Sequence, residues 1–320
     1  MVGREGDAVG SALVLGDVGS GLTTFVGLLY AAQLRLGTEE RDEFRFSADR
    51  ETIRALEGIY GELVAGRFPE GDVDWDAHPL SFVFGRRHGW LGGIGARARS
   101  SGEGFDAVDL EVGGISAREI AELADHNAIL DESARRLLRS PVVLPLVDAS
   151  RLDLDSQGTA PALLVHYDRS LARALSVLAR FLGTAPRRSA RRMAPLFIVT
   201  KFDLLPAGSR STLGLPTAGI PPPDAGGRER IGQAILGRFL PETSRALATA
   251  ADHGRLRVDP PRWFYSALAT SPGPSGPRIA RRSRVPVGGW EPEYPFEEYR
   301  ALVGELGRLA RRLPGSGRGS

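Results

Sequence analysis

Short apolar runs alternate along this chain with longer segments in which apolar residues recur every three to four positions. The runs predict strands, the first of them before a glycine-rich turn: Ser11–Leu15, Leu80–Phe84, Phe105–Val112, Val142–Val147, Leu196–Thr200 and Arg262–Ser266. The helical period predicts helices: Thr23–Leu36, Glu51–Gly66, Ala117–Leu138, His166–Leu182, Arg228–Ala250 and Phe296–Leu313. Some runs, such as Val142–Val147, lack polar alternation, which is typical of strands covered on both faces.

This order of elements predicts an α/β fold: a mostly parallel sheet with helices on both faces. Leu80–Phe84 and Phe105–Val112 should form a hairpin within it. Two stretches, Pro206–Gly227 and Ser271–Gly289, are rich in proline and either glycine or arginine, and we expect long loops or disordered insertions there. Because sheet elements continue beyond both, we expect a single domain over residues 8–313, followed by a disordered tail at 314–320.

Charge and composition narrow the possible functions. The 41 basic and 39 acidic residues nearly cancel, so there is no specific evidence for a nucleic-acid partner, although the isoelectric point is about 9.2. The chain has no cysteine, and its five histidines are scattered, which argues against thiol chemistry and a metal cluster. No apolar run reaches the roughly 18 residues of a transmembrane segment, so we expect a cytoplasmic protein.

A glycine-rich segment follows the first predicted strand. Gly16–Thr23 matches the phosphate-binding pattern G-x-x-x-x-G-K-[ST], except that Leu22 stands where lysine belongs. Its backbone amides and the following helix N-terminus would face a polyphosphate. Without the lysine, binding should weaken about ten- to a hundred-fold unless an arginine substitutes. The candidate nucleotide-binding residues here are Gly16, Gly19, Ser20, Gly21, Leu22, Thr23 and Thr24, with Thr23 also a candidate Mg²⁺ ligand.

A second segment follows the strand at Leu196. Thr200-Lys201-Phe202-Asp203 resembles the [NT]-K-x-D motif of GTPases, in which the aspartate accepts two hydrogen bonds from guanine and the lysine stem covers the base. Thr200, Lys201 and Asp203 are therefore candidate ligands of GTP or GDP. Ser266-Ala267, after the last predicted strand, resembles the element that supports the base in the same family.

A third segment bears on catalysis. Leu110–Ile115 is similar to the W-D-V-G-G-Q segment of ADP-ribosylation-factor-like GTPases. The resemblance implies that Glu111 replaces the aspartate that anchors Mg²⁺, and that Gly114 contacts the γ-phosphate. Ile115 replaces the glutamine that orients water, which leaves the catalytic residue unknown. The usual switch threonine is missing as well, and Asp72 stands near where it would be expected.

These resemblances imply a Ras-like P-loop GTPase domain with loop insertions and degraded catalytic residues. The G-R-F-P-E-G segment, the long loop before the last strand and the G-W-E-P-x-Y-P run before the final helix look like those of the prokaryotic double-GTPase-like proteins. This resemblance would imply a protein partner, possibly a second GTPase-like chain. The leading hypothesis is a guanine-nucleotide-binding switch or regulatory subunit with slow or absent hydrolysis. The alternatives are a nucleotide-free scaffold, in which Leu22 fills the phosphate pocket, and a GTPase completed by arginines in cis or from a partner. A nucleotide kinase would leave the Thr200–Asp203 motif unexplained.

Two basic runs and an aromatic group complete the candidates. Arg187–Arg192 and Arg278–Arg284 lack interleaved aromatic residues, so we interpret them as solvated loops, although an arginine from one of them could replace the missing lysine. Trp290, Tyr294 and Phe296 should pack the final helix onto the sheet.

Overall fold

The structure is a computed structural model, and it describes most of the chain. The described residues are 10–17, 19–36, 44–46, 50–69, 80–87, 105–126, 138–154, 158–184, 191–216, 224–252, 256–272, 278–284 and 289–310. Asp72, residues 187–190 of the first basic run and the tail at 314–320 lie outside them.

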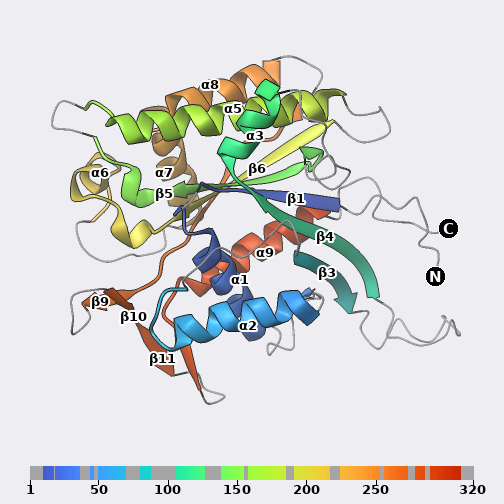
Figure 1. Cartoon of the computed structure of the whole chain (residues 1–320), viewed down its shortest axis with the longest axis vertical. Coiled ribbons are helices and arrows are strands. Elements are labelled where there is room, and N and C mark those ends of the chain that lie inside the picture. Colours follow the sequence, from blue (N-terminus) through green and yellow to red (C-terminus); the bar gives the residue numbers. More distant parts are fainter. Residues whose placement is uncertain are drawn as a thin grey trace, which may run out of the picture.

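An eight-stranded sheet forms the centre of the molecule (Figure 1). Its first six strands lie in the order β2 (Phe44–Phe46), β3 (Leu80–Arg87), β4 (Phe105–Ile115), β1 (Gly10–Leu15), β5 (Val142–Asp148) and β6 (Arg192–Thr200). Two short strands, β7 (Arg257–Val258) and β8 (Arg262–Tyr265), pair with successive parts of β6. Neighbours from β4 onward are parallel, while β2 with β3 and β3 with β4 are antiparallel.

Helices cover both faces of the sheet, as Figure 1 shows. On one face, α1 (Leu22–Leu36), α2 (Arg50–Val64) and α9 (Phe296–Ala310) share a buried cluster with alternate residues of the central strands, such as Val14 and Leu144. On the other face, the intervening residues, such as Leu13 and Val143, pack in a second cluster. Its helices are α3 (Ala117–His126), α5 (Ala162–Thr184), α7 (Ala225–Arg238) and α8 (Pro241–Asp252). The predicted α/β fold class is thereby confirmed.

The parallel strands end together at one edge of the sheet. The register pairs Leu15 with Ile115 and Asp148 with Thr200. Short 3₁₀ turns follow two of the strands at this edge: η2 (Ala149–Arg151) after β5 and η3 (Phe202–Leu204) after β6. In open α/β sheets ligands bind at this carboxyl edge, so the edge is where a site is expected.

Several sequence expectations were wrong in detail. The helix expected over Arg228–Ala250 is two helices, α7 and α8, separated at Phe239 and Leu240 because Pro241 cannot continue a helix and starts the next one. The segment Pro206–Gly227 contains α6 (Ala207–Thr212) and the start of α7. Only the first part of the helix expected over Ala117–Leu138 can be compared, because residues 127–137 lie outside the described ranges.

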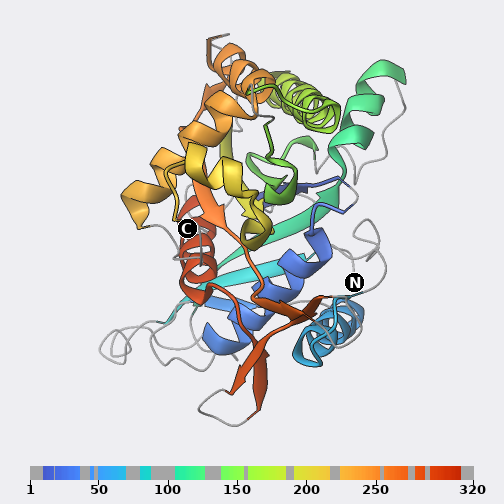
Figure 2. The same cartoon turned by 90° about the vertical axis from the view of Figure 1, so that its left-hand side faces the viewer.

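The second expected insertion, Ser271–Gly289, is also structured where it is described. It contributes to two hairpins, one of β9 (Thr270–Pro272) with β10 (Arg278–Ala280), the other of β11 (Arg282–Arg284) with β12 (Trp290–Pro292). Figure 2 shows these strands projecting beside α1 and α2. We refer to residues 270–292 as the arm. In the parts of the chain that are described, no helix has the length and apolarity required to cross a membrane.

Candidate functional site

The glycine-rich loop connects β1 to α1 at the carboxyl edge of the sheet. Gly19 and Gly21 have φ angles of +77° and +85°, in the left-handed region that glycine adopts without strain. Gly16 lies close to its neighbours: a Cβ atom there would stand 2.6 Å from Ser20 Oγ and 2.9 Å from Leu146 Cδ1. The glycines are therefore needed for the path of the backbone, whichever ligand it binds.

The Thr200–Asp203 motif touches this loop directly, although it is separated from it by most of the domain. Thr200 Oγ1 donates to the carbonyl oxygens of Ser20, at 2.6 Å, and Val147, at 3.3 Å. Lys201 Nζ donates to the carbonyl oxygen of Gly19 at 2.5 Å. Lys201 is the one described non-glycine residue with a positive φ, +51°, and its side chain extends back to the loop. The two motifs read from the sequence thus form one site.

Asp148, at the end of β5, organises the cations around the loop. Its buried carboxylate accepts hydrogen bonds from Lys201 Nζ at 2.8 Å and from the backbone N–H and hydroxyl of Ser150. Arg151 Nε lies 3.3 Å from the same carboxylate. The Arg151 guanidinium reaches the loop, because its Nη2 is 3.6 Å from where a Cβ of Gly19 would stand. Arg151 is therefore a cation at the glycine-rich loop that sequence reasoning missed, because no local motif marks it.

Asp203 lies in η3 and is largely buried. Burial raises the pKa of its carboxyl, and this is opposed by the Arg278 guanidinium and by hydrogen bonds from the Asp203 and Leu268 amides. Buried Arg210 holds the surrounding backbone by donating to the carbonyl oxygens of Phe202, Asp203 and Leu205. Arg278, from the second basic run, lies at this carboxylate with Nη2 3.6 Å from Asp203 Oδ2. It is therefore placed at the candidate base site and not at the glycine-rich loop, where an arginine of this run could have replaced the missing lysine.

Ser266 and Ala267 lie beside the motif, at the end of β8. The Ser266 amide donates to Val199 O at 2.8 Å, and its carbonyl oxygen accepts from the Phe202 amide at 3.1 Å. Its hydroxyl is 2.5 Å from the hydroxyl of Tyr299 on α9. These bonds fix the segment next to Asp203.

The remaining candidates lie at the start of α1 and along β4. Thr23 and Thr24 are half-buried in the first turn of α1, and Leu22 packs against the hydrophobic cluster on that side of the sheet. Gly114 and Ile115 pair with Val14 and Leu15, next to the loop. Glu111 lies further back along β4, paired with Ser11.

The strand register argues against Glu111 as a Mg²⁺ ligand. It pairs with Ser11, four residues before the end of β1, which is roughly 13 Å along the strand. The two expected metal ligands, Thr23 and Glu111, are therefore not brought together. The described residues also contain no group of three or more histidines or acids arranged to hold a metal ion.

Asp17, inside the loop, changes its electrostatics. Burial raises the pKa of its carboxyl, while the charges of Arg151 and His166 and a hydrogen bond from the Arg118 amide oppose the rise. Among the described residues, buried Asp17 Oδ1 and Ser20 Oγ have no hydrogen-bond partner. Buried polar atoms of this kind normally bond to protein, water or a ligand, so they suit a loop that receives one. An ionised Asp17 would repel phosphate, and the raised pKa reduces that cost.

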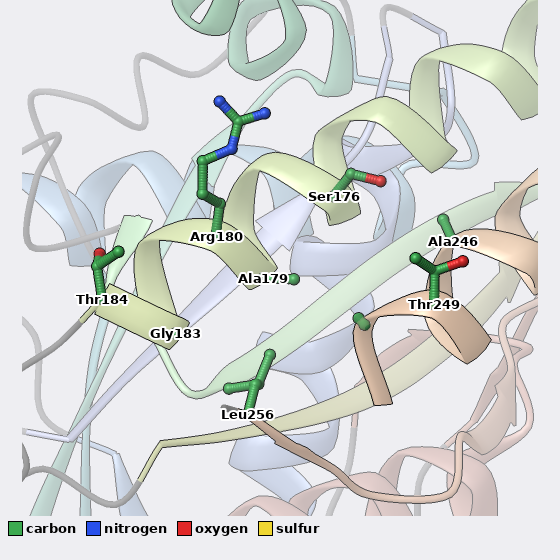
Figure 3. Close-up of a pocket in the computed structure, with 9 residues that line it drawn as sticks. Ser176, Ala179, Arg180, Gly183, Thr184, Ala246, Thr249 and Leu256 are labelled. Atoms are coloured by element: carbon green, nitrogen blue, oxygen red, sulfur yellow. The ribbon is translucent and has the colours of Figure 1, made fainter. Parts of the chain in front are cut away.

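A cavity of about 330 Å³ lies far from these residues, between α5 and α8. Figure 3 shows its lining, in which the small side chains of Ala179 and Ala246 stand above Leu256. Thr184, at the end of α5, and Leu256, just before β7, place it toward the opposite edge of the sheet. It therefore does not belong to the site built by the two motifs.

Comparisons with known proteins identify no family for this chain. No family model matches it, and no curated protein matches it. Among solved structures, it is similar to a chain of the signal recognition particle receptor SRb-GTP/SRX complex from Chaetomium thermophilum. The identity is 16%, the match covers 83% of this chain and 94% of that chain, and the TM-score is 0.36. So distant a similarity carries no conclusion about function.

Proposed function

We propose that this protein binds guanine nucleotide at the carboxyl edge of its sheet, with the glycine-rich loop at the phosphates and Asp203 at the base. The observation that carries the proposal is the direct bonding of Thr200 and Lys201 to the backbone of Ser20 and Gly19. If the two motifs were chance matches, the side chains of Thr200 and Lys201 would not be expected to bond to the backbone of the glycine-rich loop.

Asp203 supplies the chemistry that distinguishes guanine from adenine. A carboxylate accepts two hydrogen bonds from the N1–H and N2–H₂ groups of guanine, whereas the corresponding edge of adenine offers no such pair of donors. The carboxylate is largely buried and is oriented by the Leu268 amide, so it is held in place before a base arrives. Preorganisation of this kind reduces the entropy lost on binding.

Arg151 compensates in part for the missing lysine at Leu22. Its guanidinium lies beside Gly19, within the same carboxylate network as Lys201. Magnesium, if bound, would have Thr23 as its protein ligand and would neutralise phosphate charge. Because Ile115 cannot orient water and no cation projects from position 22, we expect hydrolysis to be weak or absent. The protein would then act as a switch or regulatory subunit with a protein partner, possibly a second GTPase-like chain, in the cytoplasm.

Equilibrium titration with fluorescent analogues of GTP, GDP and ATP, with and without Mg²⁺, tests the proposal. We expect guanine-selective binding that is lost in Asp203→Ala. Phe202, next to Asp203, is buried in the core, so changing it would disturb the fold. The control is therefore Gly237→Ala, at an exposed position of α7. Absence of binding at millimolar nucleotide, or equal binding of ATP, would refute it.

A nucleotide-free scaffold is the second candidate, and one observation favours it. The Asp203 carboxylate already has a cationic partner in Arg278, and Asp17 places a further carboxyl in the phosphate loop. A protein purified without nucleotide, with unfolding unaffected by added GDP, would support this alternative.

A further inference from the structure

The ion pair between Arg278 and Asp203 joins the candidate base site to the arm. Arg278 stands at the start of β10 with its side chain half-exposed, while the side chain of Asp203 is only 13% exposed. The carboxylate is therefore approached by Arg278 from the solvent side. A guanine base that binds this carboxylate must therefore displace the Arg278 guanidinium.

The guanidinium presents the same donor chemistry as the base. In guanine, the N1–C2–N2 edge is itself a guanidine-like unit that offers parallel N–H donors, and an arginine guanidinium offers the same pair to a carboxylate. At 3.6 Å the present contact is an ion pair that is longer than a hydrogen bond, so it can be exchanged for two shorter hydrogen bonds. Guanine and Arg278 therefore compete for one carboxylate.

We propose that Arg278 occupies Asp203 in the nucleotide-free protein, that guanine displaces it, and that the arm transmits this displacement to the end of α2. The inference rests on the function proposed above and adds its regulation. The base would bind more weakly than it would to an Asp203 carboxylate without an ion pair, because the ion pair must first be broken. In return, the position of the arm would report whether the base site is filled.

The arm is bonded to α2 immediately beyond Arg278. The Ala280 amide donates to Gly66 O at 2.9 Å, and Arg282 Nη1 donates to Val64 O at 3.2 Å. Gly66, two residues after the end of α2, has a φ of +85°, and a Cβ there would stand 3.4 Å from Ala280 O, so the two backbones are in close contact. A movement of β10 that frees Asp203 therefore pulls on the last turn of α2.

The far end of the arm is fixed to the body of the protein. Glu291 on β12 pairs with Arg35 of α1 at 3.2 Å, and the hydroxyl of Tyr60 on α2 donates to Trp290 O at 3.5 Å. Figures 1 and 2 both show the arm strands running alongside α1 and α2. The arm is thus held at its β12 end, and the Arg278 end is the one that exchanges its partner.

Affinity for GDP in Arg278→Ala, measured by calorimetry, tests the competition. An ion pair whose arginine is half-exposed should be worth about a two- to fivefold change, so the variant should bind GDP about two- to fivefold more tightly than the parent. The matched control is Arg281→Ala, because Arg281 lies in the same arm but pairs with Glu293 at 3.0 Å, and it should leave the affinity unchanged. Unchanged or weaker binding in Arg278→Ala, with measurable binding by the parent, would overturn the inference alone.

Hydrogen exchange provides the second readout. In the parent, GDP should speed exchange of the Ala280 amide, and in Arg278→Ala the exchange should already be fast without GDP. Exchange that GDP leaves unchanged in the parent would overturn the transmission to α2. If neither protein binds GDP at millimolar concentration, the proposed function fails and the inference fails with it.

Discussion

Gly232 on α7 provides the sharpest test of how the helices pack on the sheet. A Cβ atom at this position would stand 2.1–2.3 Å from three ring atoms of Trp263, far inside contact distance. Trp263 is buried and stacks on Phe197 with ring centroids 4.5 Å apart, so the indole has no free space into which it can turn. The change Gly232→Ala therefore forces α7 away from β8.

The size of the effect follows from two opposing contributions. Alanine favours a helix over glycine by about 1 kcal/mol, whereas overpacking a core costs about 1–3 kcal/mol. Since the Trp263 ring is held between α7 and Phe197, we expect the clash to prevail and Gly232→Ala to lose up to about 2 kcal/mol. The matched control is Gly237→Ala on the same helix, where a Cβ would meet nothing within 4 Å and should stabilise by about 0.5–1 kcal/mol.

Urea unfolding of the two variants measures the difference. The midpoint should fall for Gly232→Ala and rise slightly for Gly237→Ala, with the denaturant slope unchanged in both. Equal stabilisation of both variants would mean that Trp263 does not lie against α7, and the packing of β8 beside the candidate base site would have to be revised.

Three further predictions concern the site and its support. Thr200→Val, which leaves the Ser20 carbonyl oxygen without its donor, should cost about 1–3 kcal/mol of stability in thermal unfolding and weaken GDP binding; an unchanged Tm would contradict this. Arg151→Ala should weaken GDP binding about tenfold or more in titrations but leave guanosine binding unaltered, and an equal loss for both would refute a phosphate role. Arg228→Ala removes the cation 3.2 Å from buried Glu298, whose pKa burial already raises above 4.5, and should cost about 2–4 kcal/mol. Because the Glu298 carboxyl would titrate still higher in the folded variant, the variant's loss of stability should grow as the pH rises through the raised folded-state pKa of the parent. The loss should be absent in a Glu298→Gln background.

The central strands could be predicted from the sequence because their burial is simple. Val142–Val147 and Leu196–Val199 are covered by helices on both faces, so continuous apolar runs were a reliable sign. The strands of the arm could not be found in this way. β10 and β11 are short and rich in arginine, and the bonds that hold them, such as Ala280 to Gly66, join segments far apart in the chain.

The residues of the candidate site also fall into two groups: those in a local sequence pattern and those placed only by folding. The glycine loop and the Thr200–Asp203 motif have local patterns, and the order of the parallel strands in the structure brings them to the same edge of the sheet. Arg151 and Arg278 carry no such pattern, because each acts through a contact made only after folding. Glu111 is a different case. It lies in a plausible local motif, but its position along β4 places it away from the edge.

Exchange of the base specificity tests the central claim most directly. Asparagine at position 203 would offer an N–H donor in place of one carboxylate oxygen, which suits xanthine, whose C2 carries an oxygen where guanine has an amino group. Binding of GDP and of xanthosine diphosphate should be compared in the parent and in Asp203→Asn by the same titration. The account predicts that the parent prefers GDP and that the variant prefers xanthosine diphosphate. An unchanged preference, or no binding of either nucleotide by either protein, would contradict it.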